Sequence, residues 1–543
     1  MSAGTILAIP PFPGAKPPRF AEPDGKARQG SAFKEVLSAL AQHRVGGCYW
    51  GRHKELPASG FVLDGTGECG ADAVSWGHDD DPWHLLGKAE FARLKENDPR
   101  ALLALAAGLP VVLICDNGTV RDAGPHDAAR LVARFLTCWR FRNPFDGTEL
   151  TVIEAIELCG FWRRFIDANR RIHSVMGIAY WKKPTVSPML WAGCDVPYNR
   201  PISMMPEGAT VALWRSRLSA GQRRMIAQIR PHITEIEDGF IRSQGLGADC
   251  VPPLSIIVDA QGPHFAPGAP SELEILLQDG EFAPELLARA RALREAIIAG
   301  GLSKYESKGA GTLPRPGGRR RHVLVPGQVE DDRAVTSGGA LSSNLELLRR
   351  ARSVVGNEAY LIYKPHPDVL AGHRRGAIAQ DDLAEFADHV ETSSPIAALI
   401  AMVDELHVNS SLAGFEALMR GKPVTVYGVP FYAGWGLTTD LGPVPSRRTA
   451  RRTLDELVAA ALLLYPRYLD PHTRIPAPAE VVVRSLTEGS ARLGGGGCGG
   501  SRDAACCGPD EPIGSGVAKA WHGKDEAHRA KPFFSGIGRR ARA

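Results

Sequence analysis

The sequence lacks the features that define several large classes of protein. None of its apolar runs is long enough to span a bilayer, and the start of the chain carries no basic segment ahead of its short, proline-broken apolar stretch, unlike a secretory signal. The net charge of +4 is too small to indicate a nucleic-acid-binding protein, although it is compatible with anionic lipids or nucleotide sugars. We therefore expect a cytoplasmic protein.

Cysteine spacing gives no indication of a structural metal centre. The chain has 10 cysteines, but no two pairs are spaced as zinc ligands, and most lie in apolar stretches such as Ile114-Cys115 and Leu158-Cys159. Reduced, packed thiols agree with a cytosolic location. The sequence predicts neither a metal site nor a cofactor.

The length of the chain implies more than one domain. Its 543 residues exceed one ordinary hydrophobic core, and its composition, 44% hydrophobic and 23% charged, is that of a globular protein. The Gly-, Pro- and Arg-rich segment 309–321 is the clearest interdomain boundary. The predicted parts are a disordered N-terminus (1–30), a divergent region that is a candidate degenerate module (31–140), a first Rossmann-like domain (141–310), a second one (320–487) and a disordered basic tail (488–543).

Two motifs in the N-terminal region carry little weight. The match to G-x-G-x-x-G at 65–70 runs into an acidic loop instead of a sustained helix, which makes a dinucleotide site a weak hypothesis. The heptad 116–122 echoes 237–243, with an acid, then Asp or Asn, then Gly, and Arg three residues later. Because Asn117 stands where the later copy has Asp238, the N-terminal copy could not perform the same acid–base or nucleophilic role.

Strand and helix patterns alternate through both predicted domains. In the second domain, apolar strands at 322–325 and 360–363 flank a helix at 341–353, and residues 404–428 form a further strand–helix–strand step. Such alternation is typical of an open parallel sheet, in which ligands bind at the carboxyl edge of the strands. The predicted fold class is α/β with two Rossmann-like domains.

Three short polar motifs fall at predicted strand ends. They are Glu237-Asp238-Gly239, Lys364-Pro365-His366-Pro367 and Ser410-Ser411. Taken singly they are typical of a turn, a rigid loop and a helix cap, and a cap is the ordinary interpretation of Ser410. Together they supply a carboxylate for a sugar centre or acceptor hydroxyl, a cation or proton donor for a leaving phosphate, and neutral donors that fix that phosphate. The helix start after the serines is also suited to an anion.

Longer stretches around these motifs resemble one family. The stretches are 237–247, 325–332, 363–369, 411–418 and 427–438. They look like the corresponding parts of the capsular polysaccharide β-Kdo transferases, and the resemblance covers about residues 140 to 480. The order acid-acid-Gly, His-Pro, Ser-Ser is also similar to the motif set of bacterial sialyltransferases. Longer family members carry two transferase modules, whereas this sequence has one complete set of motifs.

The resemblance implies a GT-B-like fold, in which two Rossmann-like domains turn parallel sheets towards a cleft. It implies a glycosyltransferase that moves Kdo from CMP-β-Kdo, with retention, onto a lipid-linked Kdo acceptor in capsular linker synthesis. The implied partners are the nucleotide-sugar donor, the lipid-linked saccharide and capsule assembly or export proteins, with peripheral association at the cytoplasmic face of the inner membrane. The alternatives are a related transferase using CMP-sialic acid or a UDP-sugar, and a non-catalytic capsule-assembly protein.

By the same resemblance, Asp238 takes the catalytic acid position, with Glu237 beside it. Retention requires a covalent sugar adduct or same-face attack, so Asp238 is expected to be the nucleophile, with general base as the alternative. Two adjacent carboxylates invite different pKa values if both face the cleft, although neighbours on a strand usually point apart. His366 is expected to contact the donor's phosphate or to protonate it as it leaves.

The remaining expected residues bind substrate. Lys364 adds positive charge beside the phosphate, and Ser410 and Ser411 are expected to hold it. Glu416 resembles the acid that accepts ribose hydroxyls in many GT-B enzymes, and an ordinary helix-surface glutamate is the alternative. The other residues expected to contact donor or acceptor are Gln328, Asp332 and Arg242.

Overall fold

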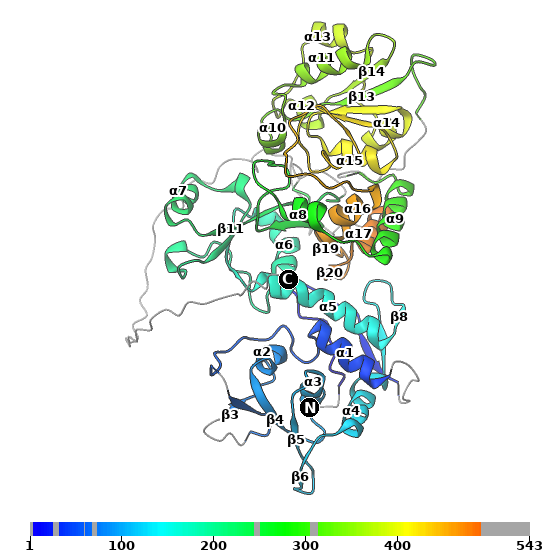
Figure 1. Ribbon diagram of the computed structural model, residues 1–543. Helices are drawn as coiled ribbons and strands as arrows, with labels where there is room; N and C mark the ends of the chain where they lie inside the picture. The colour runs from blue at the N-terminus through cyan, green and yellow to red at the C-terminus, as the bar shows by residue number, and fades with distance from the viewer. Residues whose placement is uncertain are drawn as a thin grey trace, which may run out of the picture. The chain divides into compact units, whose positions relative to one another are not determined.

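The computed structural model describes residues 4–24, 32–58, 60–67, 73–243, 250–303 and 313–489. Its strands form three sheets of five or six strands and one of three, with helices packed against them (Figure 1). The predicted α/β class is therefore confirmed. None of the described helices combines the length and the apolar character needed to cross a membrane. The predicted basic tail beyond residue 489 and residues 68–70 of the glycine motif lie outside the described residues.

The N-terminal region builds a sheet and a hydrophobic core of its own. Its strands run in the order β3 (Ala73–Ser75), β2 (Phe61–Asp64), β4 (Ala89–Lys95), β5 (Val111–Ile114) and β6 (Val120–Asp122). The first four are parallel, and β6 returns antiparallel to β5. Helices around this core are α1 (Phe33–His43), α2 (Pro82–Leu86), α3 (Pro99–Ala106), α4 (Pro125–Val132) and α5 (Val152–Asn169).

The disorder predicted for residues 1–30 is wrong for the part of this segment that the structure describes. Ile6, Leu7, Phe12 and Phe20 are buried in the N-terminal core. Further along, β1 (Ala21–Pro23) pairs with β7 (Trp139–Arg142), which also pairs with β8 (Glu149–Leu150). Prolines keep the first residues extended without helical or strand periodicity, and the composition therefore concealed their apolar contacts.

The two similar heptads have different structures. Residues 116–122 form the turn and second strand of the β5–β6 hairpin, in which the Asn117 side chain accepts a hydrogen bond from the N–H of Thr119 at 3.0 Å. Arg121 pairs with Asp127 at 2.7 Å. The residues of the N-terminal heptad therefore form a hairpin and an ion pair within the N-terminal region.

The second sheet mixes parallel and antiparallel strands. Its order is β20 (Pro476–Ala477), β19 (Arg467–Leu469), β12 (Ser255–Asp259), β11 (His232–Asp238), β10 (Thr210–Leu213) and β9 (Ile172–Met176). Strands β9, β10 and β11 are parallel, as predicted, while β12, β19 and β20 are antiparallel to their neighbours. The domain boundaries predicted at 141–310 and 320–487 therefore need correction, because residues 467–477 complete the first domain's sheet. The associated helices are α6 (Lys183–Leu190), α7 (Ala220–Ile229), α8 (Glu272–Asp279) and α9 (Pro284–Ala299).

The third sheet is wholly parallel, as the alternating pattern predicted. Its order is β15 (His389–Val390), β14 (Tyr360–Lys364), β13 (His322–Pro326), β16 (Glu405–Val408), β17 (Val424–Val426) and β18 (Thr439–Asp440). Its helices are α10 (Arg333–Gly338), α11 (Asn344–Val355), α12 (Pro367–Leu370), α13 (Gln380–Phe386), α14 (Ile396–Met402) and α15 (Leu412–Met419).

The aromatic loop at residues 429–436 and the last described helices pack into one hydrophobic cluster with residues of both domains. Phe431 of this loop stacks on Phe240, which follows β11, with ring centroids 4.6 Å apart. Tyr432 and Trp435 are fully buried in the same cluster. Helices α16 (Leu454–Val458) and α17 (Ala479–Thr487) pack against α9. The chain thus returns from the second domain to the first, which local periodicity does not reveal.

Candidate functional site

A cavity of about 770 Å³ is lined by residues of both domains. Its walls include the carboxyl ends of β11, β13, β14 and β16, the edge at which α/β sheets bind ligands. Nine of the ten residues predicted for the site line it: Glu237, Asp238, Gln328, Asp332, Lys364, His366, Ser410, Ser411 and Glu416. Three hydroxyl-bearing residues after β15, which sequence reasoning missed, also line it: Thr392, Ser393 and Ser394.

Asp238, the last residue of β11, lies between two cations. Its carboxylate is 3.1 Å from Nε of Arg242 and 3.4 Å from Nζ of Lys182. Arg242 is buried and also donates hydrogen bonds to the Ser243 hydroxyl and the Val251 carbonyl, both at 2.7 Å. Arg242 is not among the residues that line the cavity, and its guanidinium pairs with Asp238. Its expected contact with substrate stays a prediction.

Lys182 is the residue that sequence reasoning most clearly missed. It is buried, and its ammonium lies 3.3 Å from the centroid of the Trp214 ring. Burial lowers the pKa of Lys182 to about 8, although the Asp238 carboxylate opposes this shift. The sequence separation of 56 residues hid the pair, and the position of Lys182 shortly after the strand β9 is the signal that could have indicated it.

Glu237 also lines the cavity, so both adjacent carboxylates face it. Arg333, at the start of α10, binds Glu237 at 2.6 Å and Glu235 at 2.9 Å. Burial raises the pKa of Glu237 to about 7; Arg333 opposes the shift, and the carboxylates of Asp238 and Glu235 add to it. Glu237 is therefore a carboxyl group that exchanges its proton near neutral pH.

His366 stands at the helix start that follows β14. Its Nδ1 accepts a hydrogen bond from the backbone N–H of Asp368 at 3.2 Å and thereby caps α12. This hydrogen bond assigns the proton of the neutral ring to Nε2, because Nδ1 must keep its lone pair. The ring that lines the cavity is consequently a hydrogen-bond donor through Nε2, beside Lys364.

The two serines have separate roles. Ser411 caps α15, because its hydroxyl accepts the N–H of Ala413 at 3.3 Å. The hydroxyl of Ser410 donates to the Ala334 carbonyl at 3.0 Å and accepts from Nε2 of Gln328 at 3.2 Å. Gln328 also accepts the N–H of Ser410 at 3.0 Å. The capping role expected for Ser410 belongs to Ser411, and Gln328 fixes Ser410 against the start of α10.

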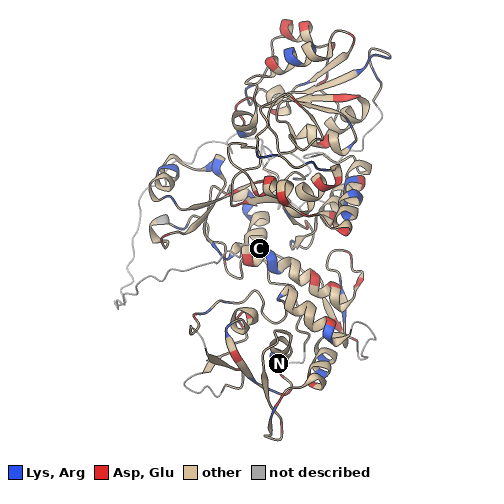
Figure 2. Cartoon of the chain, in the orientation of Figure 1, with Lys and Arg blue, Asp and Glu red and all other residues tan. Residues whose placement is uncertain are grey.

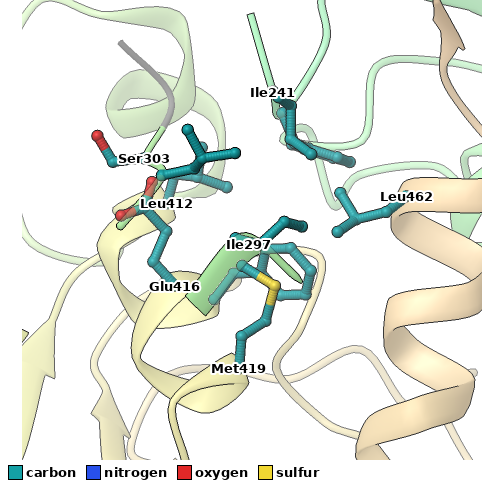
Figure 3. Close-up of a pocket in the computed structure, with 10 residues that line it drawn as sticks. Ile241, Ile297, Ser303, Leu412, Glu416, Met419 and Leu462 are labelled. Carbon is teal, nitrogen blue, oxygen red and sulfur yellow. The ribbon is translucent and has the colours of Figure 1, made fainter. Parts of the chain in front are cut away.

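Asp332 and Glu416 both line the cavity. Asp332 caps α10 by accepting the N–H of Ala334 at 2.8 Å. Glu416 is buried on α15 and also lines a smaller adjoining pocket, where its carboxylate points towards Ser303 (Figure 3). An ordinary surface position for Glu416 is therefore excluded.

The fold and the cavity define the class of protein. Two α/β domains enclose the cavity, with Glu237 and Asp238 on one wall and Lys364, His366 and the start of α15 on the other. This is the architecture of GT-B glycosyltransferases, and the GT-B-like fold predicted from the sequence is confirmed.

Comparison with known proteins gives the family. The model of the capsule polysaccharide biosynthesis protein family matches residues 209–313 and 304–468. The solved KpsC β-Kdo 2,4 transferase of Thermosulfurimonas dismutans is 31% identical, with a TM-score of 0.50, and the match covers 58% of this chain and 98% of that one. The chain therefore belongs to the capsule polysaccharide biosynthesis family, which confirms the resemblance inferred from its motifs.

Curated relatives in this family are longer than the part that matches. The capsule polysaccharide modification protein LipA of Neisseria meningitidis serogroup A is 38% identical over 65% of this chain and 51% of its own length. The lipopolysaccharide-processing protein LpsZ of Rhizobium meliloti is 44% identical over 46% of this chain and 58% of its own. The chain thus spans about half the length of the curated relatives it matches.

Proposed function

We propose that the protein transfers Kdo from CMP-β-Kdo, with retention of configuration, onto a lipid-linked acceptor that ends in Kdo. The observation that carries the proposal is the position of Asp238, an aspartate paired with two cations at the edge of a cavity whose far wall holds His366. Two cations keep a carboxylate ionised, which a nucleophile requires. One solved relative, of which the match covers 98%, is a β-Kdo 2,4 transferase, which supports the same donor sugar here.

In the first step, a carboxylate oxygen of Asp238 bonds to the anomeric carbon of Kdo. The bond from that carbon to the phosphate oxygen breaks, and CMP leaves with the electron pair. Nε2–H of His366 donates to the departing phosphate, and the ammonium of Lys364 offsets its charge. The N–H groups at the start of α15 favour the same anion.

In the second step, an acceptor hydroxyl attacks the anomeric carbon and displaces Asp238. Glu237 takes the hydroxyl proton, because a carboxyl group with a pKa of about 7 is suited to base catalysis near neutral pH. Two inversions at one carbon give net retention. Asp238 is thus the nucleophile, and the alternative role of general base falls to Glu237.

A transfer assay with the purified protein tests this function. CMP-Kdo, generated in situ, is supplied with a synthetic lipid ending in Kdo, and product is followed by mass spectrometry. Wild type should form product and a protein adduct heavier by one Kdo residue, whereas Asp238→Ala and Asp238→Asn should form neither. Undiminished product in Asp238→Ala would contradict the assigned nucleophile. Product only from CMP-sialic acid or a UDP-sugar would favour the related transferase, and no product from any donor would favour a non-catalytic assembly protein.

A lipid-linked acceptor also requires access to a membrane surface, and we propose that the first domain provides it at the cytoplasmic face of the inner membrane. Helix α7 is exposed apart from the buried Ile226 and the half-buried Gln222, and its exposed Met225 and Ile229 accompany a group of arginines (Figure 2). Residues 199–231 contain six arginines and one acid, Glu207. Such a surface suits anionic lipid headgroups, with capsule export proteins as further partners.

A further inference from the structure

Tyr180 is an aromatic residue in an unusual environment. It opens the short helix η2 (Tyr180–Lys182), which follows β9, and it is 87% exposed. Among the described residues, it is the only aromatic side chain in the group of large exposed hydrophobic residues, and it is the most exposed member of that group. An aromatic ring left open to water at a sheet's carboxyl edge is a candidate ligand contact.

The register of the sheet brings this loop to the catalytic edge. Leu213 of β10 pairs with Met176 of β9 on one side and with Glu235 of β11 on the other. Strands β9 and β10 therefore end at the same level, and β11 runs three residues further, to Asp238. The segments after β9 and β10 consequently flank Asp238. Lys182, in the same turn as Tyr180, confirms this proximity through its contact with the Asp238 carboxylate.

Two other aromatic rings at this edge are each covered by the ammonium group of a lysine. The ring of Trp214 is buried beneath the ammonium of Lys182 at 3.3 Å. The ring of Tyr198 lies under the ammonium of Lys183 at 4.8 Å, and its hydroxyl is hydrogen-bonded to Ser187 at 2.8 Å. The exposed ring of Tyr180 has no such cation over it among the described contacts.

The charge beside Tyr180 is positive. Lys182 is engaged with Asp238, but Lys183 forms no ion pair with any carboxylate in the described parts of the chain. Lys183 is half-buried with its ammonium over the Tyr198 ring, a contact that does not neutralise its charge. Lys183 follows Tyr180 by three residues, so one short segment carries an exposed aromatic ring and an ammonium. This combination suits a pyranose that carries a carboxylate, because its C–H face packs on an aromatic ring and its carboxylate pairs with a cation.

We propose that Tyr180 and Lys183 form the subsite that receives the terminal acidic sugar of the acceptor. This inference rests on the proposed function for the identity of the reaction, and it names the residues that select the acceptor. The acceptor then approaches over the loops after β9 and β10, while the donor occupies the cavity on the other side of Asp238. Neither Tyr180 nor Lys183 is among the residues that line the cavity proposed for the donor.

The test compares Tyr180→Ala with Tyr180→Phe, which keeps the ring. Loss of about 50 Å² of apolar contact corresponds to roughly a tenfold change in affinity. With CMP-Kdo saturating, the acceptor KM of Tyr180→Ala should rise about tenfold. With acceptor saturating, its donor KM should stay at the wild-type value. Tyr180→Phe should resemble wild type in both measurements. An unchanged acceptor KM in Tyr180→Ala, or an equal rise in the donor KM, would overturn the proposal.

Direct binding separates this inference from the proposed function. Saturation-transfer NMR measures binding of a soluble saccharide ending in Kdo, without donor, to wild type and the variants. Weaker binding to Tyr180→Ala and to Lys183→Met supports the subsite even if CMP-Kdo proves to be the wrong donor. Equal binding to wild type and Tyr180→Ala would refute it whatever the transfer assay shows. A probe whose carboxylate is converted to an amide should bind wild type about as weakly as the acid binds Lys183→Met, and tight binding of the amide would exclude the role of Lys183.

Discussion

Replacement of Lys182 by methionine should disable the site while leaving its shape nearly unchanged. Nζ of Lys182 lies 3.4 Å from the Asp238 carboxylate, a separation worth about 5 kcal/mol at an effective dielectric constant of about 20. Arg242 stays in place at 3.1 Å and takes over part of that stabilisation. We therefore expect a loss of roughly 2 to 3 kcal/mol in transition-state stabilisation, or about 30- to 150-fold in kcat/KM.

The pH dependence of kcat/KM provides the sharper measurement. Because burial lowers the pKa of Lys182 to about 8, the wild-type ammonium loses its proton as pH rises through about 8, and activity should fall there. Lys182→Arg keeps a charge at every accessible pH, so its activity should persist to higher pH even if its absolute rate is lower.

Two results would refute this account of Lys182. One is a Lys182→Met enzyme whose kcat/KM stays within about threefold of wild type, since the expected loss is at least tenfold larger. The other is a Lys182→Arg enzyme that loses activity at the same alkaline pH as wild type. Lys88→Met, which removes an exposed lysine of the N-terminal region, serves as the matched control and should leave both kcat/KM and the pH profile unchanged.

Three further predictions concern pH, capping and membrane binding. Folding raises the pKa of Glu237 from 4.5 to about 7, so the free energy of unfolding should fall as pH rises through that range. Glu237→Gln, which cannot ionise, should flatten this fall in urea-unfolding measurements. Identical pH profiles for wild type and variant would contradict the prediction. Ser411→Ala should lower the free energy of unfolding by about 1 kcal/mol through loss of the α15 cap, and an unchanged melting temperature would argue against that cap. Met225→Ser combined with Ile229→Ser should reduce sedimentation with anionic phosphatidylglycerol vesicles at least twofold, whereas Val354→Ser on α11 should not; equal effects would exclude α7 as the contact surface.

Much of the second domain followed from local sequence pattern. Short apolar runs alternating with amphipathic segments predicted the parallel sheet, because each strand and helix there is continuous in sequence. The motifs containing Asp238, His366 and Ser411 were identified at strand ends, and the carboxyl-edge rule then predicted that they would gather around one cavity. Lining the cavity agrees with the predicted roles of these residues, and those roles stay predictions until they are assayed.

Tertiary structure decided the sheet of the first domain and the surroundings of Asp238. Strands β19 and β20 return to complete a sheet that begins with β9, and antiparallel pairing over such a separation leaves no local periodicity. The same holds for the ion pair of Arg333 with Glu237, whose members lie 96 residues apart in the sequence.

The sequence by itself determined the order of elements, the parallel second domain, the family and the acid at position 238, because each depends on short, contiguous patterns. Only the tertiary structure decided what surrounds that acid. Lys182 contacts its carboxylate, and the exposed Tyr180 lies in the same short helix as Lys182, because the register of the parallel strands brings the segment after β9 to the end of β11. Arg242 pairs with Asp238 from only four residues further along the chain. The pairing of Lys182 with Asp238 and the exposure of Tyr180 depend instead on packing between distant segments, which local pattern does not encode.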